Sequence, residues 1–187
     1  MHEFRKYISK KFEFTSSEIE AIVTCFEIRK LKKQEYFLTE GQFCKSIAFV
    51  EEGGFLYYQN IEGDEKACDF TFENDWITPF ESLQNNTPSP VNIRALENAK
   101  ILVLNMQKLE KLSEGLPKVL TIKTILTDAY FADVKKREVS LASLKVEELY
   151  QQLIVDFPDI HKRVQQYHIA SYLGIKPQAL SKIRSTS

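Results

Sequence analysis

The sequence is poor in cysteine and contains no long apolar run. Three cysteines, Cys25, Cys44 and Cys68, lie far apart among 187 residues, too few and too scattered for a disulfide framework. No segment approaches the roughly 20 apolar residues that a membrane span requires. The first residues also lack the apolar stretch of a signal peptide. These absences predict a cytoplasmic protein without a membrane partner.

Charge is distributed unevenly along the chain. The formal net charge is -1, but residues 161–187 carry five basic residues and no acidic one, which leaves residues 1–160 at -6. A basic end on an acidic body is typical of a chain that presents this end to nucleic acid. The charge alone would be explained equally well by an exposed cationic helix end.

Hydrophobic spacing predicts short helices followed by strands. Residues 1–24 have helical spacing, with a capping box at Thr15–Glu18. The period then shifts toward two, and turn signals separate strands expected at residues 26–31, 46–51, 55–59, 66–72, 91–95 and 99–104. This pattern predicts an α+β fold with an antiparallel β-barrel or jelly roll over residues 1–115. The polar segment 75–90 is either a ligand loop or, as the sequence favours, an ordinary surface loop.

Residues 116–139 form the longest predicted helix. Its apolar face is wide, and we expect it to pack partly on the barrel and partly on a second subunit, which predicts a homodimer. A helix lying wholly on its own domain is the alternative. Residues 140–143 are a predicted hinge, followed by an amphipathic helix at 146–157 within a C-terminal domain of residues 140–187. The expected dimer contacts are Val119, Ile122, Leu126 and Ala129.

Residues 165–184 have the pattern of two short helices around a tight turn. Ala170 is small enough for a second helix to cross closely, and Gly174 can adopt the positive φ of a sharp turn. Pro177 suits the first turn of the next helix, and Leu180 then faces back toward the first helix. This is the helix-turn-helix pattern, whose second helix enters the DNA major groove.

The outward face of the second helix carries the residues expected to read bases. Gln178 can pair with adenine, Lys182 can reach guanine, and Ala179 can touch a thymine methyl group. Each polar residue taken singly could be on the surface simply because water solvates it. Their joint placement on one face favours double-stranded DNA as the partner. Two such motifs in a dimer predict a palindromic operator with half-sites about 34 Å apart. Ser181 also faces outward, and the residues expected to contact phosphates are Gln166, Tyr167, Ser171, Lys176 and Arg184.

The order of barrel, long helix and two-helix motif resembles the Crp/Fnr family of bacterial transcription regulators. His168–Arg184 is similar to the I-A-S-Y-L-G-I-T-P-E-x-L-S-R-I-R ending of one branch, and Asp156–Asp159 also matches that branch. Less specific similarities to the sensory domain are Leu38–Gly41 and Phe49–Gly53. The resemblance implies a cyclic-nucleotide-binding-like sensor, a DNA-binding homodimer and, as a further possible partner, RNA polymerase.

The sensor departs from the family members that bind cyclic AMP. In those members a glutamate holds the ribose and an arginine pairs with the cyclic phosphate. The corresponding residues 78–80 and 89–91 contain neither group, and Arg94 lies on the strand beyond. A buried phosphate without a cation is costly, so we predict weak or no cyclic AMP binding. A pocket for another, unknown effector is expected among Trp76, Thr78, Pro79, Phe80, Leu83, Ser89 and Val91.

The sequence predicts no cofactor and no metal site. The iron–sulfur members of the family need four cysteine ligands, and His2, His161 and His168 give no convincing haem ligand. A cupin-like enzyme is one rival, but residues 26–105 contain no histidine for the usual metal cluster. The other rival is a sensory or scaffold dimer that has lost DNA binding.

Overall fold

Two short helices open the chain in the computed structural model, which describes residues 1–186. They are α1 (His2–Lys11) and α2 (Ser16–Val23). The hydroxyl of Thr15 accepts a hydrogen bond from the N–H of Glu18, whose carboxylate accepts one from the N–H of Thr15 at 2.7 Å. This reciprocal pair satisfies two N–H groups at the start of α2 and confirms the predicted capping box.

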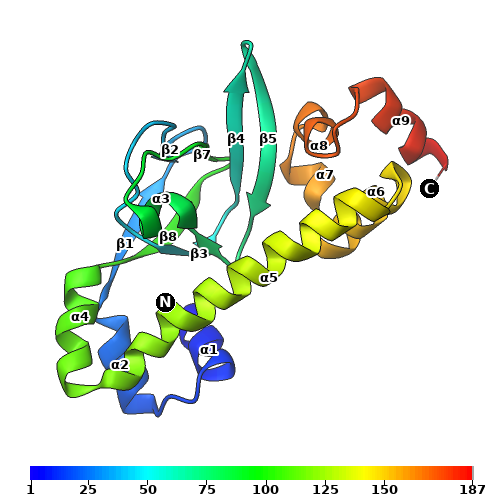
Figure 1. The fold of residues 1–187 in the computed structure, drawn as a ribbon. Coiled ribbons are helices and arrows are strands. Elements are labelled where there is room, and N and C mark those ends of the chain that lie inside the picture. Colours follow the sequence, from blue (N-terminus) through cyan, green and yellow to red (C-terminus); the bar gives the residue numbers. More distant parts are fainter. Residues whose placement is uncertain (187) are drawn as a thin grey trace.

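The strands of residues 1–186 form two antiparallel sheets of four strands each (Figure 1). One sheet has the order β1 (Phe26–Leu31), β8 (Ala99–Leu104), β3 (Ala48–Glu52) and β6 (Trp76–Ile77). The other has the order β2 (Tyr36–Leu38), β7 (Asn92–Ala95), β4 (Phe55–Ile61) and β5 (Asp64–Thr71). Apolar residues of both sheets, among them Val50, Phe55 and Ile101, form one buried cluster.

The two sheets make a sandwich of jelly-roll type, which confirms the antiparallel fold but corrects the barrel. No strand pairing among the described residues joins one sheet to the other. Two of the edge strands, β2 and β6, span only three and two residues, which leaves little backbone to pair across the gap. The sheets are therefore held together by apolar side chains rather than by a closed hydrogen-bond ladder.

The segment 75–90 is structured rather than a surface loop. It contains β6 and the short helix α3 (Phe80–Asn85). The fully buried Ser82 donates a hydrogen bond to the carbonyl of Thr87 at 2.6 Å and accepts one from the N–H of Cys44 at 3.0 Å. A helix of six residues is too short for a recognisable 3.6-residue repeat, which explains why the sequence favoured a loop.

A long helix connects the sandwich to the C-terminal helices (Figure 1). After α4 (Met106–Gly115) and a 3-10 turn (Pro117–Leu120), α5 runs from Thr121 to Ser143. The predicted hinge at 140–143 is thus wrong, because these residues continue the helix. The hydroxyl of Ser143 donates to the carbonyl of Val139 at 2.7 Å, so the serine is satisfied within the helix.

Four helices complete the described chain and share an apolar cluster with the second sheet. They are α6 (Val146–Asp156), α7 (Ile160–Arg163), α8 (Gln166–Tyr172) and α9 (Pro177–Thr186). Leu56, Phe70 and Phe72 of the sheet side belong to the same buried cluster as Leu153, Ile169 and Leu180 of the helices. The sandwich and the C-terminal helices are therefore packed together. None of the described helices is long and apolar enough to span a membrane.

Candidate nucleic-acid interface and central cavity

Helices α8 and α9 are joined by a tight turn. Gly174 has a φ of +70°, and the N–H of Ile175 donates to the carbonyl of Ala170 at 2.9 Å. Ala170 and Leu180 are completely buried where the two helices meet. The predicted positive φ and the inward direction of Leu180 are confirmed.

The left-handed backbone of Gly174 predicts a specific cost for any side chain there. Gly174→Ala is expected to lower the free energy of unfolding by about 1 kcal/mol, because a non-glycine residue in this region costs about 1–2 kcal/mol. An added Cβ would meet no atom within 4 Å, so a steric clash does not contribute.

Gly115→Ala is the matched control, since Gly115 has equal open space and no positive φ. Urea denaturation of both variants measures the difference. Equal losses of unfolding free energy in the two variants would contradict the view that the positive φ of Gly174 causes the cost.

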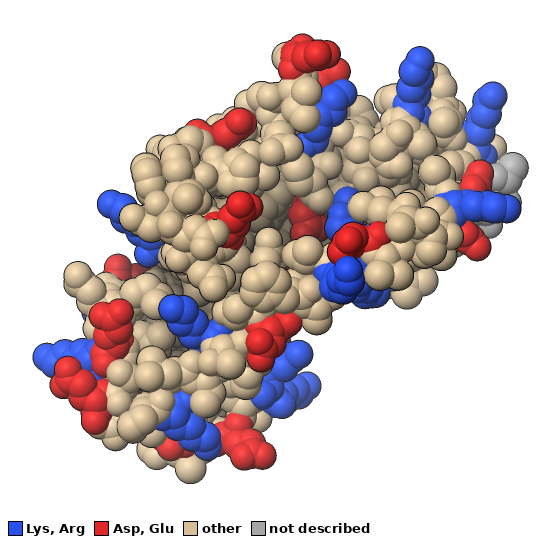
Figure 2. Space-filling model, viewed as in Figure 1, with Lys and Arg blue, Asp and Glu red and all other residues tan. Residues whose placement is uncertain are grey.

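The outer face of α9 carries polar side chains at the end of the molecule. Lys176, Gln178 and Arg184 are exposed, as are Ser181 and Lys182. Figure 2 shows basic side chains projecting from the upper right, where α8 and α9 lie in Figure 1. Ala179 is half-buried. The residues predicted to read bases therefore lie together on one helix.

Gln166 joins the two helices to each other. Its side-chain amide donates to the hydroxyl of Ser181 at 2.6 Å and to the carbonyl of Pro177 at 3.2 Å. These two contacts fix α8 against the first turn of α9. Gln166 and Ser181, predicted to contact DNA, are thus engaged with each other in this structure.

The opposite side of α8 lies against the second sheet. The N–H of Ala67 on β5 donates to the hydroxyl of Ser171 at 3.0 Å. The predicted phosphate contact of Ser171 is corrected accordingly, because this hydroxyl faces the sheet. Tyr167 is 46% exposed, with its ring 3.9 Å from that of His168.

His168 is part of a buried charged cluster between α8 and the sheet. Its Nε2 lies 2.9 Å from the carboxylate of Glu65, which accepts two hydrogen bonds from Arg94 at 2.6 and 2.7 Å. Burial lowers the pKa of His168, and the Glu65 carboxylate opposes this effect. The hydrogen bond from Arg94 is the main cause of the lowered pKa of Glu65. His168 thus packs inside the molecule, and no sequence signal linked positions 65 and 168.

Two basic residues of the C-terminal segment are paired with acidic ones. Arg163 donates to Glu73 at 2.7 and 2.8 Å and to Glu97 at 2.8 Å, and its guanidinium lies over a phenylalanine ring. Lys162 pairs with Asp159 at 2.6 Å. Arg163 and Lys162 are therefore held by acidic side chains of this chain.

The region that corresponds to the cyclic-phosphate cassette is closed by internal hydrogen bonds. The hydroxyl of Ser89 donates to the carbonyl of Val91 at 2.8 Å, and the N–H of Ser89 donates to the carbonyl of Gln42 at 2.8 Å. Arg94, the nearest arginine in sequence, is held by Glu65. Residues 78–80 and 89–91 themselves include no Lys, Arg or His side chain.

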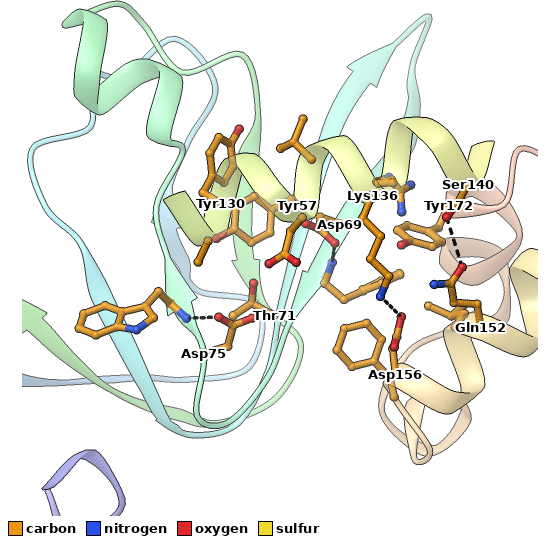
Figure 3. A pocket seen from close by; sticks show the side chains of 18 of the residues that line it. Tyr57, Asp69, Thr71, Asp75, Tyr130, Lys136, Ser140, Gln152, Asp156 and Tyr172 are labelled. Carbon is orange, nitrogen blue, oxygen red and sulfur yellow. Dashed lines mark hydrogen bonds and ion pairs between the residues drawn. The ribbon is translucent and has the colours of Figure 1, made fainter. Parts of the chain in front are cut away.

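A cavity of about 510 Å³ lies between the sandwich, α5 and the C-terminal helices (Figure 3). Three predicted pocket residues, Trp76, Thr78 and Phe80, line it. Four others do not, namely Pro79, Leu83, Ser89 and Val91. The wall also includes residues of β4, β5, α5 and α8 that the sequence did not predict as pocket residues. They include Tyr57, Asp69, Tyr130, Asp133, Arg137 and Tyr172.

Two carboxylates at the sandwich side open into this cavity. Asp69 accepts a hydrogen bond from the N–H of Phe70 at 2.9 Å, and Asp75 accepts one from the N–H of Trp76 at 2.7 Å. Asp69 is solvent-exposed, and desolvation by the surrounding protein raises its pKa to about 6. The N–H of Phe70 and the charge of Arg137 oppose this shift, and repulsion from Asp75 and Asp133 adds to it. Partial burial also raises the pKa of Asp75.

The predicted dimer contacts lie mostly inside the subunit. Val119, Ile122 and Leu126 are at most 4% exposed and belong to a cluster that includes Phe4 of α1. The chain's own N-terminal helices therefore cover these three residues, which corrects their assignment to a subunit interface. Ala129 is exposed.

Comparison with known proteins gives a family match that covers the sandwich and α4. Residues 28–115 match the cyclic nucleotide-binding domain family. The predicted resemblance of the sensor is confirmed at this level. No curated protein matches the sequence. Among residues 1–186, no three His, Cys, Asp or Glu side chains gather as a metal ion would require.

Solved structures of bacterial regulators have the same fold as almost the whole chain. FixK2 from Bradyrhizobium japonicum is 14% identical, with a TM-score of 0.72 and coverage of 86% of this chain and 83% of that chain. The c-di-GMP-responsive regulator CLP from Xanthomonas campestris is 13% identical, with a TM-score of 0.69 and coverage of 92% and 91%. A crp/fnr-family transcriptional regulator from Eubacterium rectale is 15% identical, with a TM-score of 0.68 and coverage of 97% and 87%. The cyclic nucleotide-binding domain, long helix and C-terminal helices thus share the architecture of Crp/Fnr regulators.

Proposed function

We propose that this protein is a homodimeric, sequence-specific DNA-binding transcription regulator of Crp/Fnr type. The observation that carries the proposal is the α8–turn–α9 unit, whose second helix exposes Gln178 and Lys182 at the end of a regulator fold. In this proposal residues 1–115 are the sensor, 116–139 the dimerisation segment and 140–187 the DNA-binding part. Ser187 lies outside the described residues.

The N-terminal half of α9 is the part that would enter the major groove. Gln178 is one residue after the start of the helix, and Lys182 follows one turn later on the same face. A glutamine can bind adenine bidentately and a lysine can reach guanine, which gives base specificity. Lys176 and Arg184, on either side, would contact phosphates and fix the register.

The dimer contact is proposed on exposed apolar side chains of α5, two of which, Val134 and Leu141, also lie in the wall of the central cavity. Phe131, Val134 and Leu141 are 54%, 45% and 52% exposed. Their spacings of three and seven residues place them on one stripe, as in the seam of a coiled coil. These side chains replace Val119, Ile122 and Leu126 as the proposed contacts, and two copies related by a dyad would present two α9 helices to DNA.

Cyclic AMP is not the effector in this proposal. The cassette holds neither of the two charged groups that bind the ribose and the cyclic phosphate in the cyclic-AMP-binding relatives. Burying the phosphate next to Ser89 and Val91 would remove its hydration without supplying a cation. The DNA-binding activity is therefore expected to be independent of this nucleotide.

Selection of bound sequences from a random double-stranded pool tests the function directly. We expect enrichment of a palindrome whose half-sites are about 34 Å apart, or one helical turn. Addition of cyclic AMP to a parallel selection is expected to leave the enriched sequence and its yield unchanged. Absence of enrichment at low salt would contradict DNA reading and favour a scaffold dimer.

A further inference from the structure

The central cavity has aromatic rings on several sides. Tyr57 comes from the sandwich, Tyr130 from α5 and Tyr172 from α8. Figure 3 shows Tyr57 and Tyr130 on one side of the space and Tyr172 on the other. A volume of about 510 Å³ lies within the range of about 300–1,000 Å³ typical of small-molecule sites. The cavity is thus large enough, and apolar enough, for a metabolite-sized ligand.

Three carboxylates of the cavity wall have no ion-pair partner among residues 1–186. They are Asp69 on β5, Asp75 before β6 and Asp133 on α5. Figure 3 shows Asp69 and Asp75 on the sandwich side of the cavity, close to Tyr57 and Thr71. Asp75 and Asp133 repel the negative charge of Asp69. A cation between these side chains would relieve that repulsion.

Three basic residues also line the wall, and the charge of Arg137 favours the ionised form of Asp69. Lys136 lies 3.9 Å from Asp156, and the guanidinium of Arg137 lies 3.7 Å from the centre of the Tyr172 ring. Lys11 of α1 also lines the cavity, and its charge acts on Asp75. A ring already stacked by Arg137 shows that this wall accommodates a cation against an aromatic face.

We propose that the cavity binds a small organic cation, with its ammonium group among Asp69, Asp75 and Asp133 and its apolar body against the aromatic rings. The carboxylates supply the charge, and the rings add cation–π attraction of about 0.5–2 kcal/mol. The same carboxylates repel an anionic nucleotide. This inference goes beyond the proposed function and does not depend on DNA binding.

Three ligands of nearly the same shape but different charge test whether the cavity prefers a cation. Tyramine carries an ammonium group, tyrosol a hydroxyl in its place, and 4-hydroxyphenylacetate a carboxylate. Titration calorimetry and the fluorescence of Trp76, the only tryptophan of the chain, both report binding to the intact protein. Tyramine is expected to bind at least tenfold more tightly than tyrosol, and 4-hydroxyphenylacetate is expected not to bind.

Matched aspartate variants locate the bound cation. Asp69→Asn and Asp133→Asn are each expected to weaken tyramine binding at least tenfold. Asp64→Asn, at the exposed tip of the β4–β5 hairpin, removes the same charge and is expected to leave binding unchanged.

No tyramine binding at 10 mM, binding of the carboxylate as tight as that of the amine, or unchanged affinity in both cavity variants would overturn the proposal. Because these measurements use no DNA, their outcome is separate from that of the operator selection.

Discussion

Gln178→Ala/Lys182→Ala is expected to lower the affinity for the selected operator about 30-fold or more. Each bidentate side chain–base contact contributes about 1–3 kcal/mol of discrimination, and the double variant removes both residues from the exposed face of α9. Two contacts together amount to about 2–6 kcal/mol, or a factor of about 30 at the low end. Affinity for random DNA should fall much less, because phosphate contacts by Lys176 and Arg184 remain. Competition binding with operator and random duplexes measures both quantities.

The chain offers a closely matched control for this experiment. Gln107 and Lys111 are exposed on α4 with the same residue types at the same four-residue spacing. Gln107→Ala/Lys111→Ala therefore removes equal charge and surface far from α9 and is expected to retain full operator affinity. Equal affinities of the two double variants would contradict base reading by α9.

Leu180→Ala is expected to destabilise the protein by about 2–5 kcal/mol. Leu180 is completely buried where α9 packs on α8, and removal of a buried leucine side chain loses both transfer free energy and packing. Since Leu180 belongs to the cluster that contains Leu56 and Phe70, the loss should appear in the main unfolding transition rather than in a separate early one. Urea denaturation followed by circular dichroism measures it.

Leu120→Ala provides the control, because Leu120 is 47% exposed and the same atoms are removed there. The expected loss is below about 1 kcal/mol. A loss at Leu180 no larger than that at Leu120 would mean that α9 is not anchored by its apolar face.

The parts of the fold that depend on local sequence were predictable. β1 and β8 begin and end at the predicted residues, because alternating and β-branched residues between turn signals specify strands locally. The turn at Gly174 was also predictable, because the need for positive φ is a property of one residue and its neighbours. Resemblance to a known ending then connected these local features to DNA.

The features that depend on distant contacts were not predictable. The apolar stripe of α5 was recognised, but its partner was not, because periodicity shows that a face is buried and not what covers it. Most of the cavity wall escaped prediction for a related reason. Its wall joins Asp69 to Tyr172, which are about a hundred positions apart and share no motif. Ser171 was assigned to phosphate because its hydroxyl suits that role, whereas the fold turns it toward Ala67.

The position of α8 has a consequence for the biosynthesis of the protein. β5 is an edge strand of its sheet, and the N–H of Ala67 on this edge is satisfied by a side chain of α8 rather than by another strand. An open strand edge is a template for pairing with other chains. During synthesis β5 is complete about a hundred residues before α8 leaves the ribosome. The edge of β5 is therefore uncovered while those residues are being added. The last helices of the chain thus also protect the sandwich against aggregation.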